Sequence, residues 1–189
     1  RNLPHFEKPW AIYAIHFATR RPRRLSPSAR RKVLDCILHW NDERYRLMTA
    51  CVMPDHVHLI IQPKIESIDS GGGPAFYSLE KILHTIKSYT AHEINRLESA
   101  NGALWEKESF DRYVRSDRDL EEKFHYICRN PWDSGLVQPN EPYPWLWTPD
   151  AEASVGSARG PRAPVGGPPT GTDNPESPRT TDGCSVPTP

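Results

Sequence analysis

The order in which strand-like and helix-like hydrophobic patterns follow one another is the feature that most limits the fold of this chain. Residues 10–20 (WAIYAIHFATR), 46–53 and 56–62 are rich in branched and aromatic side chains and predict three strands. Helical spacing lies between and after them. A helix capped by Ser26 or Ser28 is expected to run through Val33, Leu34, Ile37, Leu38 and Tyr45, and a second covers residues 79–97.

The remaining pattern completes one domain. A short strand or loop is expected around residues 104–114. The last helix begins at Ser116 or Asp117 and ends at Asn130, because Pro131 disfavours helical geometry in the residue before it. The order β-α-β-β-α-β followed by a helix predicts an α+β domain of the ferredoxin-like type, an antiparallel sheet with helices packed on one face plus a C-terminal helix.

A change in composition near Pro149 sets the expected domain boundary. Residues 1–149 form the domain, with its folded part at about 9–147, whereas residues 150–189 contain mainly Pro, Gly, Ser and Thr. Such a segment cannot bury enough apolar surface to offset its ordering entropy, so we expect a disordered tail. Within the domain, the Gly-rich stretch of residues 67–76 is expected to be a flexible loop.

Charge and cysteine content narrow the class of protein. The 24 basic and 24 acidic residues cancel, so contact with a nucleic acid would rest on local clusters. The four cysteines show no C-x-x-C pairing, and no run resembles a signal peptide or a membrane span, which favours a cytoplasmic protein without a membrane partner. The cationic candidates for phosphate contact are Arg20, Arg21, Arg23, Arg24, Lys87, Arg112, Arg115 and Lys123.

Two histidines in the stretch VMPDHVHLIIQP are the strongest candidates for chemistry. Side chains alternate across a strand, so His56 and His58 point the same way and could chelate one cation if another ligand joined them. On the last helix Tyr126 and Asn130 are one turn apart and share a face. Each feature also has an ordinary explanation, a polar strand face in one case and packing and helix termination in the other.

Together these residues resemble a known family. VMPDHVHLIIQP resembles the HUH motif (His, hydrophobic residue, His) of single-tyrosine transposases, and HTIKSYTAHEINR with the segment up to FHYICRNPWDSGLV is similar to the rest of the IS200-like transposase domain. The ending FHYICRNPWDSGLV is most similar to REP-associated tyrosine transposases. The resemblance implies that His56, His58 and Asn130 bind a divalent metal ion, Mg²⁺ or Mn²⁺, and that Tyr126 is the catalytic nucleophile.

The same resemblance implies a substrate and an activity. The expected partner is single-stranded DNA folded into hairpins of repeated palindromic elements. The expected reaction is cleavage and strand transfer through a 5′-phosphotyrosine, by a monomer at the bacterial nucleoid. Three alternatives remain open: a dimeric insertion-sequence transposase of the same superfamily, a non-catalytic protein that binds DNA hairpins, and a metal-dependent phosphohydrolase that does not use Tyr126.

A truncation tests the domain boundary. A chain ending at Pro149 should keep its melting temperature and DNA cleavage, because the removed residues lack the apolar side chains needed to join a core. Thermal unfolding of the two chains provides the comparison. A large fall in melting temperature would show that the folded domain extends beyond Pro149.

Overall fold

The computed structural model describes residues 8–149, so the predicted disordered tail lies outside the described residues. Its elements are β1 (Tyr13–Ala18), α1 (Pro27–His39), β2 (Tyr45–Val52), β3 (His56–Pro63), β4 (Ile65–Ile68), β5 (Pro74–Phe76), α2 (Leu79–Leu97), β6 (Phe110–Tyr113), α3 (Asp117–Asp133) and β7 (Leu146–Trp147). Five strands form one antiparallel sheet in the order β6-β1-β3-β2-β7. Within this sheet the strands β6-β1-β3-β2 lie in the ferredoxin-like order, which confirms the predicted fold class.

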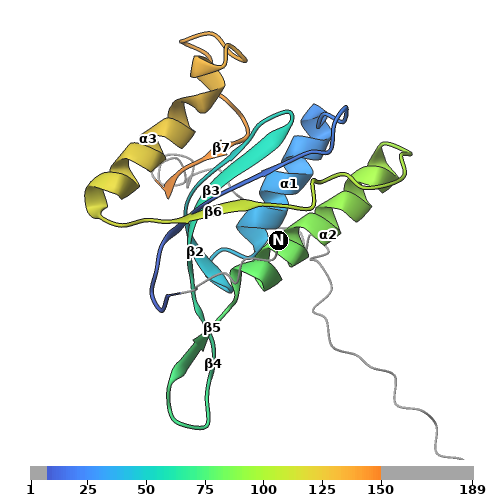
Figure 1. The fold of residues 1–189 in the computed structure, drawn as a ribbon. Helices are drawn as coiled ribbons and strands as arrows, with labels where there is room; N and C mark the ends of the chain where they lie inside the picture. Colours follow the sequence, from blue (N-terminus) through green and yellow to red (C-terminus); the bar gives the residue numbers. More distant parts are fainter. Residues whose placement is uncertain (1–7, 150–189) are drawn as a thin grey trace, which may run out of the picture.

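The two faces of the sheet are covered by different helices (Figure 1). On one face, odd-numbered residues of β1 and β3 such as Ile15, Phe17 and Leu59 pack with α1 and α2 into the larger core. Each such side chain stabilises the fold by about 1.5–3 kcal/mol relative to an exposed position. The opposite face packs against α3 through a smaller cluster that includes Ile60 and Ile127. The sheet therefore has a helical layer on each side, with α3 alone on the second.

The predicted starts of the helices agree with the structure, but two predicted ends, those of α1 and α3, do not. Ser26, one of the two expected caps, accepts a hydrogen bond from the Ala29 amide, and α2 has the predicted bounds. Helix α1, however, ends at His39, and Tyr45 begins β2. The chain turns between them, with Asp42 in the left-handed region (φ 67°). Tyr45 matches the helical spacing only by coincidence, and its buried hydroxyl donates to the Ile37 carbonyl at 2.7 Å.

Helix α3 also differs from its predicted end. It continues through Pro131 to Asp133, so the predicted end at Asn130 is wrong. A proline lacks one amide donor, and near the end of a helix this removes only a single hydrogen bond. The chain then leaves the helix through a tight turn at Gly135 (φ 69°), in which backbone amides from residues 134–136 return to the carbonyls of Asn130, Pro131 and Trp132.

The Gly-rich stretch is more ordered than a flexible loop. Its flanks form the two-stranded hairpin β4–β5, and the Asp69 carboxylate accepts hydrogen bonds from the Gly71 and Gly73 amides at 2.8 Å. Gly72 lies between them with φ 81°, a conformation that glycine adopts without strain. Hydrogen bonds to the Asp69 carboxylate therefore order this turn, although it has few apolar side chains to bury.

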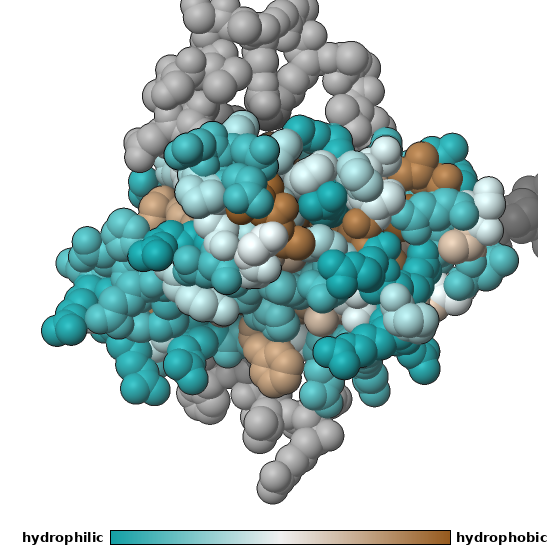
Figure 2. All heavy atoms as spheres, turned by 90° about the horizontal axis from the view of Figure 1, so that it is seen from above, coloured by the Kyte–Doolittle hydropathy of each residue, from teal (hydrophilic) through white to brown (hydrophobic). Residues whose placement is uncertain are grey.

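Most of the surface seen from above in Figure 2 is hydrophilic, and apolar side chains appear there only in small, separate groups. Within residues 8–149 no helix has the length and apolar character needed to cross a membrane. The three cysteines in that part of the chain, Cys36, Cys51 and Cys128, are free thiols.

Candidate active site

Three histidines meet on the sheet face that α3 covers. His56 and His58 lie on β3, two residues apart, and point away from the larger core as predicted. His16 on β1 is the register partner of His58, so its side chain emerges beside theirs. One ligand nitrogen from each of the three rings lies within 4.8 Å of the others. We define these three residues as the histidine cluster.

Sequence reasoning missed His16, although a signal for it was present. The alternation of Tyr13, Ile15 and Phe17 assigns the odd positions of β1 to the core, which leaves His16 on the other face. The ferredoxin-like order then places β1 next to β3. Sequence spacing alone could not show that His16 would lie opposite His58, because the register of two distant strands depends on their packing.

The imidazoles of the cluster are suited to binding a metal ion. Burial, followed by the neighbouring His56 and His16, lowers the pKa of His58 to about 3, and burial is also the main reason that the pKa of His16 is lowered. Both rings are therefore neutral at pH 7, and the neutral imidazole is the form that ligates metals. Metal–nitrogen bonds of about 2.1 Å place two ligands at most about 4.2 Å apart, so small side-chain movements would bring all three nitrogens onto one ion.

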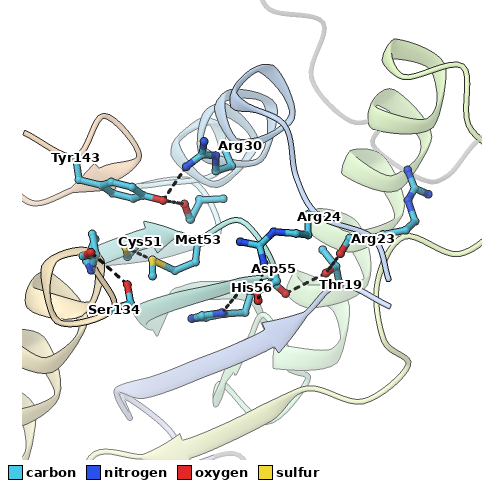
Figure 3. A network of polar contacts seen from close by, with 12 residues as sticks. Thr19, Arg23, Arg24, Arg30, Cys51, Met53, Asp55, His56, Ser134 and Tyr143 are labelled. Carbon is cyan, nitrogen blue, oxygen red and sulfur yellow. Dashed lines mark hydrogen bonds and ion pairs between the residues drawn. The ribbon is translucent and has the colours of Figure 1, made fainter. Parts of the chain in front are cut away.

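His56 is held by a carboxylate. Its Nδ1 lies 2.7 Å from the Asp55 Oδ1, and the Asp55 backbone carbonyl accepts hydrogen bonds from the amide and the hydroxyl of Thr19 (Figure 3). A carboxylate on one ring nitrogen orients the ring and leaves the Nε2 for a metal. The histidine cluster is therefore suited to a divalent cation both because its ring nitrogens are close together and because the His56 ring is oriented by Asp55.

Tyr126 lies beside the cluster because α3 packs across this face. Leu120, Phe124 and Ile127 of α3 pack on the sheet, as their spacing predicts. The Tyr126 ring is next in the helix, with its centroid 5.7 Å from that of His58. The residue is 59% exposed, and its hydroxyl has no hydrogen-bond partner among residues 8–149. The side chain that sequence reasoning singled out as a nucleophile is therefore accessible and next to the histidines.

Asn130 lies one turn further along α3 and is half-buried. Its backbone carbonyl accepts from the Ser134 amide, whereas its side chain lines neither of the hollows at the cluster. On this helix Lys123, Tyr126 and Ile127 line the hollow that His16 and His58 also line. Asn130 stays a predicted ligand, and His16 is a second candidate for the same role.

Two hollows open on either side of the histidine cluster. The arginine hollow, of about 440 Å³, is lined by His16, Ala18, Thr19, Arg21, Pro22, Arg23, Arg24, Asp55 and His56. The tyrosine hollow, of about 430 Å³, is lined by Ala14, Ile15, His16, His58, Phe110, Asp111, Arg112, Lys123, Tyr126 and Ile127. His16 borders both hollows, so the cluster separates them.

Seven of the eight predicted cationic residues fall into two groups. Arg21, Arg24, Arg112 and Lys123 line the hollows together with Arg23, whose guanidinium is bound to Asn95 and Glu98. The Lys123 ammonium also pairs with Asp119. Arg20 and Arg115 are exposed but line neither hollow.

Lys87 has a different environment from the other predicted cations. Its ammonium donates to the carbonyls of Glu106 (2.7 Å) and Lys107 (3.2 Å) and to the Ser109 hydroxyl (3.1 Å). Burial lowers its pKa, with an opposing contribution from Glu106. These three hydrogen bonds connect α2 to the segment before β6, so we interpret Lys87 as a structural residue at this edge of the sheet.

The aromatic residues near the site differ in how exposed they are, and therefore in whether a base could stack on them. Trp105 is in the core, where its Nε1 donates to the Thr90 hydroxyl at 3.0 Å, and Tyr89 is partly buried. Tyr113 is 38% exposed. Phe110 is 70% exposed and lines the tyrosine hollow.

The fold and site define a ferredoxin-like domain with a histidine cluster on one sheet face and an accessible tyrosine from the final helix beside it. Residues 13–130, from the start of β1 to the last turn of α3, match the family model described as IS200-like transposase. The chain belongs to the IS200-like transposase family, a family of DNA-processing enzymes.

Two individual proteins show the same relationship. A candidate REP-associated tyrosine transposase of Haemophilus influenzae is 23% identical over 101 residues, which cover 53% of this chain and 57% of that protein. A solved structure of a REP-associated tyrosine transposase bound to a REP hairpin is similar in fold, with a TM-score of 0.63 and 15% identity, over 92% of this chain and 99% of the other. The chain therefore spans just over half the length of the Haemophilus protein.

The environment of His58 predicts acid-dependent stability. Its folded-state pKa of about 3 is below its ordinary value of 6.5, so the unfolded chain binds more protons between these pH values. The neutral, half-buried His58 ring therefore makes its full contribution to the free energy of unfolding above about pH 6.5. As the pH falls toward 3, this contribution is lost, and at pH 5 the loss is about 2 kcal/mol. Urea unfolding at pH 7 and pH 5, with chelator present, should show this loss in the wild type and a smaller loss in His58→Gln.

An exposed histidine is the matched control. His84→Gln, on the outer side of α2, should keep the pH dependence of the wild type. An equal loss of stability in the wild type and in His58→Gln would contradict the assignment of the neutral ring to the folded state.

Proposed function

We propose that this protein is a metal-dependent endonuclease and strand transferase for single-stranded DNA, acting at hairpin-forming repeats through a covalent 5′-phosphotyrosine intermediate. The observation that carries the proposal is the position of Tyr126, accessible and 5.7 Å from the His58 ring, on the same face as three clustered imidazoles. The similarity to a protein bound to a REP hairpin supports the substrate class. Because such a substrate is chromosomal, we expect the protein to act at the bacterial nucleoid.

His16, His56 and His58 would hold the cation, with Asn130 as the oxygen ligand that the family resemblance implies. When bound, a divalent cation polarises a non-bridging phosphoryl oxygen and orients the scissile group. Three imidazole nitrogens suit Mn²⁺ better than Mg²⁺, which prefers an all-oxygen shell.

Tyr126 would form and later break the covalent link. Its Oη attacks the phosphorus, the bond from phosphorus to the 3′-oxygen breaks, and the released 3′-OH takes a proton. Rejoining reverses the bonds, because a 3′-OH attacks the phosphotyrosine and the proton returns to Oη. One phosphodiester is exchanged for another, so strand transfer needs no other energy source. With no side-chain acceptor at the hydroxyl among the described residues, and 59% exposure, the phenolic proton leaves to solvent.

The single-chain site supports a monomer. Tyr126 approaches His58 of the same sheet, and three α3 residues pack on that sheet. The site thus has its nucleophile and its histidines without a second copy. A dimeric insertion-sequence transposase with exchanged tyrosine helices would need the same face to receive α3 from a partner.

Metal binding tests the cluster independently of cleavage. In titrations of Mn²⁺ followed by calorimetry, His56→Ala, His58→Ala and His16→Ala should each weaken binding about tenfold or more, because each removes a ligand. Asn130→Ala should cost less than His16→Ala, and His84→Ala, an exposed histidine on α2, should bind as the wild type. Undiminished affinity in His58→Ala would refute the assignment of the cluster as the metal site.

Covalent trapping tests the nucleophile. Tyr126→Phe removes one oxygen and keeps the ring, so folding and hairpin binding should be unchanged. With Mn²⁺ and single-stranded hairpins, the wild type should give a protein–DNA adduct on a denaturing gel and Tyr126→Phe should give none. Tyr113→Phe and Tyr89→Phe are the matched controls and should keep the adduct. An adduct that persists in Tyr126→Phe would remove the nucleophile from α3.

A mixture of inactive variants separates the monomer from the dimer with exchanged helices. Tyr126→Phe retains the histidines and His58→Ala retains the tyrosine. If each chain builds its own site, mixing the two should restore no adduct. Recovery of about a quarter or more of the wild-type adduct would favour a partner-supplied tyrosine. A wild type that binds hairpins but never forms an adduct would favour a non-catalytic binding protein.

A further inference from the structure

We infer that the two hollows are the nucleotide subsites on either side of the scissile phosphate. The base on the 3′ side of the cut stacks on Phe110 in the tyrosine hollow, and the nucleotide on the 5′ side, which carries the leaving 3′-oxygen, occupies the arginine hollow. The inference rests on the proposed function and adds the direction, 5′ to 3′, in which the DNA strand crosses the site.

Phe110 is presented toward the cluster and is largely exposed. It lies on β6, an edge strand of the sheet, and is the register partner of His16. Partners in a ladder share a face, so its ring points to the histidine side, 6.2 Å from the His16 ring. With 70% of the residue exposed, a large apolar surface stays open at the rim of the hollow.

The other walls of the tyrosine hollow fit a nucleotide rather than an apolar ligand. Arg112 on the same strand and Lys123 on α3 bring positive charge to its rim, beside the Asp111 carboxylate, and Lys123 is paired with Asp119. An aromatic face flanked by cations is the combination that binds unpaired nucleotides, because any base can stack on the ring while the cations contact phosphate. Tyr126 lies in the same wall, so a nucleotide held here is next to the nucleophile.

The arginine hollow has the complementary character. Arg21 is exposed and its guanidinium has no hydrogen-bond or ion-pair partner within residues 8–149, and Arg24 lies 4.0 Å from the Asp55 carboxylate. The segment that carries both arginines is fixed to the turn between β2 and β3. The Thr19 amide donates to the Asp55 carbonyl at 2.8 Å, and the Leu25 amide donates to the Pro54 carbonyl (Figure 3 shows Thr19, Arg24 and Asp55). The phosphate-binding groups are thus held beside the cluster before DNA arrives.

The geometry of displacement orients the strand. His56 borders only the arginine hollow and His58 only the tyrosine hollow, so the order along the sheet is arginine hollow, cluster, tyrosine hollow. In an in-line displacement the attacking and leaving oxygens are on opposite sides of phosphorus. Because Tyr126 attacks from the tyrosine hollow, the 3′-oxygen leaves toward the arginine hollow. The nucleotide on the 3′ side stays near Tyr126 as the phosphotyrosine.

The test combines protein variants with modified hairpins whose cut position has been mapped with the wild type. Binding is measured by fluorescence anisotropy in the Tyr126→Phe background, so that the DNA stays intact. Phe110→Ala should weaken binding about tenfold, and Phe110→Trp should restore it. An abasic site on the 3′ side of the cut should abolish the difference in affinity that Phe110→Ala causes, and an abasic site on the 5′ side should leave it unchanged.

The arginine hollow is tested on the same hairpins. Arg21→Gln should reduce the slope of log affinity against log salt by about one, and a methylphosphonate at the phosphate on the 5′ side of the cut should remove that difference. Matched controls lie away from both hollows: Trp10→Ala, an aromatic residue 61% exposed, and Arg46→Gln, an exposed arginine on β2. Both controls should bind as the wild type.

The possible failures are distinguishable. A Phe110→Ala defect that survives the 3′ abasic site, or disappears only with the 5′ abasic site, would overturn the subsite assignment while leaving an adduct-forming enzyme intact. A wild type that forms no adduct with any hairpin would overturn the proposed function together with this inference.

Discussion

The antiparallel pairing of β1 with β3 at the centre of the sheet is the interaction on which the rest of the structure depends. Its register joins Ile15 to Leu59 and Phe17 to Val57 on the side that α1 and α2 cover. The same register joins His16 to His58 on the other side. A shift of one residue would exchange the two faces, so the apolar core fixes the histidine geometry. The stability of the core and the assembly of the cluster are thus consequences of one alignment.

Helix α3 adds the candidate nucleophile, Tyr126, to this arrangement through its own apolar stripe. Leu120, Phe124 and Ile127 pack on the second face and set the rotation of the helix, which directs Tyr126 toward His58. Because the stripe is narrow, α3 has little freedom to rotate without exposing these side chains. The precision of the site therefore comes from ordinary hydrophobic packing on both faces of one sheet.

Sequence patterns predict most of this fold, since strand and helix periodicities are local properties. The bounds of α2, the Ser26 cap and the common face of His56 and His58 follow from nearby residues alone. Features that depend on distant contacts do not. The position of His16 depends on strand register, and the role of Lys87 depends on three acceptors from another segment. The end of α3 lies beyond its predicted position because proline removes only one donor there, and the turn at Gly135 satisfies the carbonyls of Asn130, Pro131 and Trp132.

The connection between β6 and α3 bears on how the site is assembled. Only residues 114–116 separate the edge strand from the helix. Val114 is buried, and the Arg115 amide donates to the Asp119 carboxylate, which also pairs with Lys123. Exchange of a helix between subunits requires a hinge that can extend, and this hinge is short and bonded at both ends. Because the tyrosine helix is bound so closely to its own edge strand, Tyr126 lies beside His58 of the same chain.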